Sequence, residues 1–224
     1  LNPPTSAPTS SDVAFKLPTS DGSAGQVLTT DGSGNLSWVN GPDYVKIDRQ
    51  TNGGVSGALI FDNLDVATFK FFDLMLVFVP EQDNHNTYFR FRTGGASGAD
   101  VSTSKYDYAY NEVYPVDTQG GKAAGDEDKI RLSGGIGYNT NYAEGFRLNL
   151  RIMFADTNDN GISKRLANFI TWQGCRLDGS TNFRTNQGTG IYNNDSSTFP
   201  TGFKIFMDSG SINSMSYGLY GMKR

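Results

Sequence analysis

The chain has 224 residues, of which 37% are hydrophobic and only 19% are charged, and its formal net charge is −4. This length corresponds to one large domain, or to one domain with a small appendage. The low charge content excludes a disordered polyelectrolyte and a coiled coil, and the negative balance argues against a protein that holds nucleic acid or anionic lipid. The abundance of glycine and aromatic residues is typical of a turn-rich β protein.

Residues 1–16 are rich in proline, serine and threonine and contain little to bury. A segment of this composition is predicted to be an extended arm that becomes ordered only against a partner. It has neither the basic nor the apolar block of a signal peptide. No run of the chain approaches the ~20 apolar residues of a membrane helix, so we expect no membrane insertion.

Residues 17–42 are predicted to form a β-hairpin, because the Asp31-Gly32 pair lies between two short β-prone runs. A hairpin alone is marginally stable in water, and this one is too small to bury its own apolar side chains. Those side chains are Val27, Leu28, Leu36 and Trp38. We expect three copies of the chain to share them around a threefold axis. Packing against the rest of the same chain is the alternative.

Residues 43–224 are predicted to form one all-β domain, in which about ten candidate strands alternate with turn signals. The most apolar run, residues 68–79, is expected to be a central strand that is buried on both faces. Short strands joined mostly by turns favour a jelly-roll β-sandwich. The expected fold is therefore all-β: an N-terminal arm and β-hairpin followed by a jelly roll.

A row of tyrosines is the feature of this domain that most suggests binding. Tyr106, Tyr108 and Tyr110 alternate along one predicted strand, and Tyr114 follows them. A tyrosine ring offers a flat apolar face and a hydroxyl, a combination that suits carbohydrate, so these four residues are the candidate receptor-binding residues. The alternative is that they cover the core or a neighbouring subunit.

The sequence contains no convincing catalytic or metal-binding pattern. Residues 156–161 fit the first half of a calcium loop, but Ala167 stands where the closing carboxylate is required. Two further acidic stretches, at 126–128 and 193–195, are expected to be solvated loop tips. The only histidine is His85, and the only cysteine, Cys175, is expected to be buried in a strand. The carboxylates available to a glycosidase, which lie in no recognisable motif, are Glu112, Asp117, Glu144 and Asp178. We expect no enzyme activity, no cofactor and no metal.

Two stretches resemble known proteins. The sequence LPTSDGSAGQVLTTDGSGNLSW at 17–38 resembles a unit found in tail-fibre and other appendage proteins of bacteriophages, including phages of cyanobacteria: LP-x-x-DG-x-x-GQVL-x-(S/T)DG-x-G-x-x-x-W. A looser resemblance spans 56–222. There the apolar run at 69–80, the sequence YFRFR at 88–92 and the terminal GLYGM at 218–222 are similar to jelly-roll head domains at the ends of phage fibres.

The resemblance implies a homotrimeric structural protein of the virion, assembled in the host cytoplasm. The hairpin would belong to the stalk, and the jelly roll would be the distal head that attaches to a glycan or protein of the host surface. The arm at 1–16 would bind other virion proteins, and nucleic acid is not an expected partner. The alternative is a head fibre or capsid decoration protein with no receptor role.

Overall fold

The computed structural model describes residues 15–94, 97–114, 119–138, 144–155, 168–193 and 199–223. All named elements of this described part are β-strands, so the all-β prediction is confirmed. The chain divides into two compact units, Leu1–Asp43 and Tyr44–Arg224, which we call the N-terminal and the C-terminal unit. The predicted arm lies outside the described residues, except for Phe15 and Lys16 at its end.

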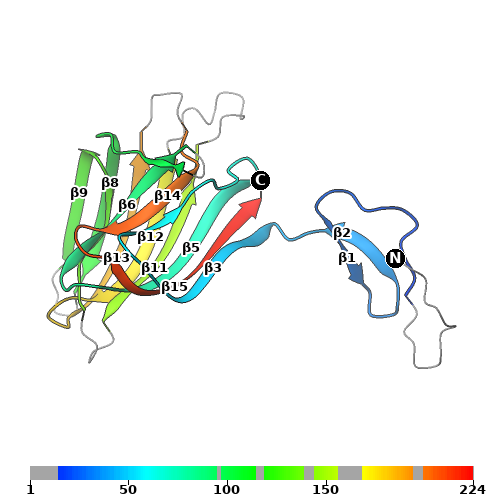
Figure 1. The fold of residues 1–224 in the computed structure, drawn as a ribbon, viewed down its shortest axis with the longest axis horizontal. Coiled ribbons are helices and arrows are strands. Elements are labelled where there is room, and N and C mark those ends of the chain that lie inside the picture. Colours follow the sequence, from blue (N-terminus) through cyan, green and yellow to red (C-terminus); the bar gives the residue numbers. More distant parts are fainter. Residues whose placement is uncertain are drawn as a thin grey trace. The chain divides into compact units, whose positions relative to one another are not determined.

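The described part of the N-terminal unit contains one antiparallel hairpin, formed by β1 (Gln26–Thr30) and β2 (Leu36–Asn40) (Figure 1). Its turn is fixed by the Asp31 carboxylate, which accepts hydrogen bonds from the backbone N–H groups of Ser33 and Asn35 at 2.8 and 3.1 Å. Gly32 and Gly34 adopt positive φ angles of 80° and 88°, a conformation that glycine reaches without steric cost. The predicted hairpin therefore forms.

The C-terminal unit contains a five-stranded and an eight-stranded sheet, in which every strand pair is antiparallel (Figure 1). The five-stranded sheet consists of β10 (Ile130–Ile136), β6 (His85–Thr93), β14 (Gly202–Met207) and β4 (Ala58–Phe61), with β7 (Ala99–Asp100) paired to β6. The eight-stranded sheet has the order β3 (Tyr44–Val55), β15 (Ile212–Lys223), β5 (Phe69–Pro80), β11 (Gly145–Met153), β12 (Asn168–Leu177), β13 (Phe183–Tyr192), β8 (Tyr106–Val113) and β9 (Gln119–Glu127).

The two sheets enclose one aromatic core. Phe91 of β6 packs edge-on against Phe154 and lies parallel to Tyr106 of β8, so a ring of one sheet contacts rings of the other. Trp172 of β12 donates its indole N–H to the carbonyl oxygen of Leu132 in β10 at 2.9 Å. The packed sheets form a β-sandwich. The jelly-roll connectivity expected from the sequence remains a prediction.

The central strand β5 is buried on one face only, which corrects the expectation of burial on both faces. Phe72, Leu74, Leu76 and Phe78 point into the core, whereas Met75 and Val77 between them are exposed. Successive side chains of a strand point to opposite faces, so a second layer would have to cover the latter pair. The described residues form no such layer over Met75 and Val77. The apolar composition of the run alone does not indicate that only one face of the strand is buried.

Space for Trp172 depends on glycine in the neighbouring strand. Gly188 of β13 is the register partner of Trp172, and a Cβ added to Gly188 would lie 2.4 Å from the indole ring and 2.6 Å from Tyr110. Real Cβ atoms do not approach other atoms so closely, so the ring or the strand would have to move.

We predict that Gly188→Ala lowers the free energy of unfolding by about 1 to 3 kcal/mol, the usual effect of overpacking a core. The matched control is Gly120→Ala in β9, where the new Cβ would make an ordinary contact of 3.4 Å with the Tyr114 ring. Urea denaturation of both variants measures the difference. Equal stability of the two variants would show that the Trp172 pocket is not tightly packed.

Candidate functional site

The tyrosine row is part of the core, not of the surface. Tyr106, Tyr108 and Tyr110 are all buried. The Tyr106 hydroxyl donates to the carbonyl oxygen of Val101 at 2.8 Å and accepts the Phe91 N–H at 3.0 Å. Burial raises the pKa of Tyr108 to about 12, as expected for a phenol removed from water. The prediction that these three residues contact a receptor is therefore wrong, and the alternative of a core-facing stripe is confirmed.

Tyr114, the fourth candidate, is half-buried and belongs to a cluster of charged residues at one end of the core. Its hydroxyl donates to the Glu112 carboxylate at 2.7 Å, and the Arg184 guanidinium lies 4.1 Å from its ring centre. The buried Arg176 also pairs with Glu112, with 2.5 Å between Nη1 and Oε1. Tyr114 is thus occupied by contacts within its own chain.

The four apolar side chains proposed for trimer contact do not lie on one face of the hairpin. Leu28, Leu36 and Trp38 share one face, because Leu28 pairs with Trp38 and Thr30 with Leu36. Val27 points to the opposite face, where it pairs with Val39. The four side chains therefore cannot form one cluster on a single face, since adjacent strand residues alternate between faces. Their contact with other copies of the chain stays a prediction.

Both faces of the hairpin nevertheless leave apolar surface uncovered. The exposed fractions are 42% for Val27, 42% for Leu28, 36% for Trp38 and 40% for Val39, while Leu36 is half-buried. Trp38 is partly covered by its own chain: its indole N–H donates to the Ser20 carbonyl oxygen at 2.9 Å, and Gly22 lies directly against its ring. The N-terminal unit therefore carries apolar surface that its described residues do not bury.

The outer face of the eight-stranded sheet carries a row of carboxamide side chains. Asn111 of β8 pairs with Gln187 of β13, Gln187 with Gln173 of β12, and Gln173 with Asn149 of β11. All four side chains are exposed, and none has a hydrogen-bond partner among the described residues. We call these four residues the amide row. It is a line of solvent-exposed hydrogen-bonding groups, across four neighbouring strands, that have no partner among the described residues.

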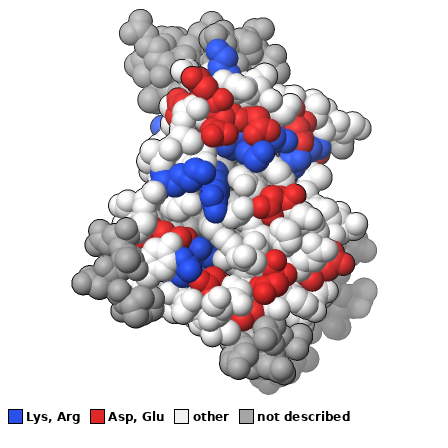
Figure 2. All heavy atoms as spheres, turned by 90° about the vertical axis from the view of Figure 1, so that its left-hand side faces the viewer, with Lys and Arg blue, Asp and Glu red and all other residues white. Residues whose placement is uncertain are grey.

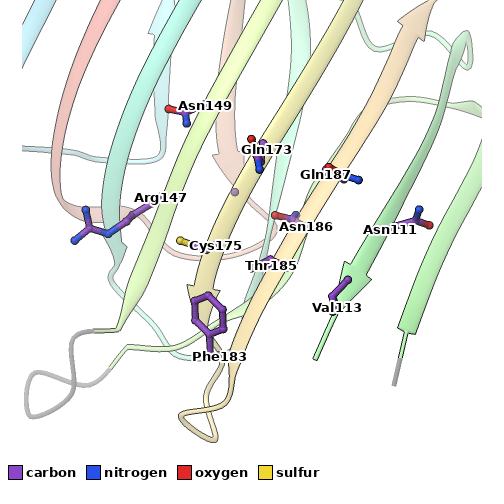
Figure 3. A pocket seen from close by; sticks show the side chains of 11 residues that line it. Asn111, Val113, Arg147, Asn149, Gln173, Cys175, Phe183, Thr185, Asn186 and Gln187 are labelled. Atoms are coloured by element: carbon purple, nitrogen blue, oxygen red, sulfur yellow. The ribbon is translucent and has the colours of Figure 1, made fainter. Parts of the chain in front are cut away.

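A depression of about 570 Å³ lies along the amide row (Figure 3). Beyond the four amides, its side-chain lining includes Val113 and Phe183, which are exposed, and Thr185. Figure 3 shows these side chains on neighbouring strands, with the amides along one side of the depression and Phe183 near its end. The site combines neutral polar groups and Arg147 with an apolar border, and no aspartate or glutamate lines it among the described residues.

Cys175 also lines this depression, and it is half-buried. It lies on the outer face, where Arg147 of β11 and Thr185 of β13 are its register partners. Cys175 lies in a strand, as expected, but it is only half-buried, so the expectation of a buried cysteine is wrong. No histidine lines the depression with it, so the partner that would activate a cysteine nucleophile is absent from this site.

The charged side chains of the five-stranded sheet differ from the amide row because they satisfy one another. Arg92 donates to Asp62 at 2.7 Å and also pairs with Asp100, which is contacted in turn by Lys204. Arg90 pairs with Asp128. On the face of the molecule shown in Figure 2, basic and acidic side chains lie next to each other, and no large patch of one sign forms there. These charged side chains pair with one another within the chain.

The carboxylates considered for a glycosidase are held by partners or by burial. Asp178 pairs with Arg184 and accepts the N–H groups of Ser180 and Asn182, both at 2.9 Å. Burial raises the pKa of Glu144, and the negative charges of Asp83 and Asp178 raise it further. Asp117 lies outside the described residues. The described carboxylates Glu112, Glu144 and Asp178 do not line the depression, so the described part of the chain brings no acid pair to it.

Metal-binding candidates find no support among the described residues, which contain no group of three or more histidine, cysteine or acidic side chains able to hold an ion. Asp126 and Asp128 form no such group; Asp128 pairs with Arg90 and Lys129. The calcium-like stretch at 156–161 and Asp195 lie outside the described residues. In the part of the chain that the structure covers, no helix has the length and apolar character needed to cross a bilayer.

A comparison of the chain with family models, with curated proteins and with solved structures gave no significant match.

The amide row was missed in the sequence, although part of its signal is visible there. Asn149 stands between Leu148 and Leu150, and Gln173 follows Trp172, so both occupy polar positions of an alternating pattern. This alternation places each residue on the outer face of its own strand. It does not reveal that β11, β12, β13 and β8 are neighbours in a register that aligns their amides.

The buried ion pair at the end of the core yields a pH-dependent prediction. Burial alone would raise the pKa of Glu112, but contacts with Arg176, Tyr114 and Arg184 outweigh it and hold the pKa below its usual value of 4.5. The carboxylate thus stabilises the fold above that value, and its contribution is lost as the pH falls through the depressed pKa. At pH 7, Glu112→Gln should lower the free energy of unfolding by roughly 3 kcal/mol, because Arg176 loses its buried counter-charge.

Urea denaturation between pH 7 and pH 3 should show the gap between the wild type and Glu112→Gln closing in acid. The control is Glu127→Gln, a carboxylate in β9 for which no ion pair forms within the described residues and whose loss should change stability by less than 0.5 kcal/mol or so. A gap that stays constant with pH would contradict a charged Glu112 in the folded protein.

Proposed function

We propose that this chain is a structural protein of a bacteriophage virion: a homotrimeric fibre whose C-terminal unit is a jelly-roll head that attaches to the host surface. In this proposal the hairpin at 17–42 belongs to the stalk, and the arm at 1–16 connects it to other virion proteins. The sequence of the hairpin suggests the phage origin. The amide row suggests what the head does.

The apolar surface of the hairpin supports self-association. A two-stranded hairpin needs further strands or another layer to be stable in water. Leu28 and Trp38 expose apolar area on one side and Val27 and Val39 on the other, so additional copies of the chain would bury surface that water now contacts. The gain arises only on assembly, which is the property of an obligate oligomer.

The unused hydrogen-bonding groups of the amide row carry the proposal that the head attaches to a surface. Four exposed amides aligned across neighbouring strands can exchange their contacts with water for contacts with the polar groups of a host molecule. Each single contact with a host molecule would be weak. Three heads held on one stalk would bind with greater avidity without any new contact, as in other multivalent attachments.

The first test concerns attachment. The full-length protein, added at micromolar concentration, should slow the adsorption of the phage that carries it to its host cells, because free heads occupy the same sites. Adsorption assays with and without the protein measure this effect. Undiminished adsorption at saturating protein would contradict a receptor role and would favour the alternative of a capsid decoration protein.

The second test concerns the oligomeric state. Sedimentation of the wild type should give the mass of three chains, and Leu28→Asp should shift it to one chain, because a carboxylate would be buried without a partner. Ser33→Asp, which adds the same charge at the exposed turn of the hairpin, should remain trimeric. A wild type that is monomeric at micromolar concentration would refute the trimer.

A further inference from the structure

Resting on the proposed attachment function, we propose that the amide row binds a neutral, hydroxyl-rich polysaccharide chain of the host surface. The ligand would lie in the depression, across strands β11, β12, β13 and β8, with its hydroxyl groups on the amides and its apolar ring faces against Val113 and Phe183. This assignment moves the saccharide site from the buried tyrosines to a face that the sequence did not single out.

Hydrogen-bonding capacity is the first reason for this ligand class. A carboxamide carries an acceptor oxygen and an NH₂ group that donates twice, and a sugar hydroxyl both donates and accepts. Asn111, Gln187, Gln173 and Asn149 make no side-chain hydrogen bond within the described part of the chain, so their full capacity is available. Such groups complement a polyol better than an apolar or a purely acceptor-bearing ligand.

The spacing of the row is the second reason. Neighbouring strands of a sheet lie about 4.8 Å apart, so four residues in register span roughly 14 Å. The row therefore presents repeated, equivalent groups along a line, and a polymer of repeated sugar units presents repeated hydroxyls in the same way. Thr171 and Thr189, register partners in the next row of the same outer face, extend the polar surface beyond the amides.

The charges that line the depression argue against the charged polymers of a cell surface as ligands. Arg151 is neutralised by Asp73, which accepts from Nε at 2.7 Å and from Nη2 at 2.8 Å. Of the described residues that line the depression, only Arg147 is charged, and it has no carboxylate partner in that part of the chain. A polyanion requires a cluster of cations, and a cationic ligand requires carboxylates. The lining that the structure describes has neither.

The apolar border of the depression is a further reason for this ligand class. Val113 and Phe183 are 47% and 48% exposed, although both are large apolar side chains. An exposed aromatic ring beside hydrogen-bonding groups suits the C–H face of a sugar ring, which is apolar while its edge is polar. The depression thus has one apolar side and one polar side.

The experiment uses the full-length protein and a panel of defined polysaccharides: the neutral polymers dextran, mannan and galactan, and the acidic polymer alginate. Affinity gel electrophoresis measures how strongly each polymer retards the native protein. We expect retardation by at least one neutral polymer, and at least a tenfold loss of affinity in Gln173→Ala/Gln187→Ala. Gln82→Ala, an exposed glutamine between β5 and β6, should bind as the wild type does.

Sedimentation and thermal unfolding of each variant, run in parallel, separate ligand binding from assembly and folding. Unchanged retardation of the double variant would overturn the site. Retardation by alginate alone, or by no polymer, would overturn the ligand class. A double variant with a changed oligomeric mass would show that the face joins copies of this chain instead. In each of these cases, continued competition with phage adsorption would leave the attachment function standing, whereas loss of that competition in the wild type would refute the attachment function itself.

Discussion

One contact links the core of the sandwich to its outer surface: the Trp172 ring packed against Gly188. The indole fills the space that glycine leaves in the neighbouring strand, and its N–H bonds to Leu132 in the opposite sheet. This contact favours the register in which Trp172 faces Gly188. Because side chains alternate along a strand, the residues that follow in β12 and precede in β13, Gln173 and Gln187, then meet on the outer face. The packing that stabilises the interior therefore also aligns the groups proposed to bind.

The two sheets use polar residues in different ways. In the five-stranded sheet, arginine, lysine and aspartate side chains pair with one another, so little of their bonding capacity is left for a ligand. In the eight-stranded sheet, the described lining of the depression between β11 and β8 contains one charged side chain, Arg147, and the amides have no partner among the described residues. Partner selection would thus rest on hydrogen bonds and shape rather than on long-range attraction, and the multivalent fibre would compensate for weak single contacts.

Much of the fold was predictable from turn residues and from the alternation of apolar and polar side chains. Which face of each strand is turned to the core was not predictable. The sequence places Tyr106, Tyr108 and Tyr110 on one side of a strand, yet only the packed structure shows that this side is internal. The composition of strand β9 does not predict a strand, because its glycine, alanine and lysine residues have low β propensity; pairing with β8 overrides that preference. The opposite orientation of Val27 and Leu28 was predictable, since they are adjacent in a strand. The amide row was not predictable, because it depends on the register among four neighbouring strands.

The outer face of the eight-stranded sheet is the surface proposed to meet the host. Hydroxyl-radical footprinting of the full-length protein, free and bound to host envelopes, tests it most directly, because oxidisable side chains report on both sides of the sandwich. Met75 and Phe183 lie on the eight-stranded face, and Tyr88 and Phe206 on the five-stranded one. Binding is expected to protect Met75 and Phe183 and to leave Tyr88 and Phe206 unchanged. Protection of Tyr88 and Phe206 alone would contradict this expectation.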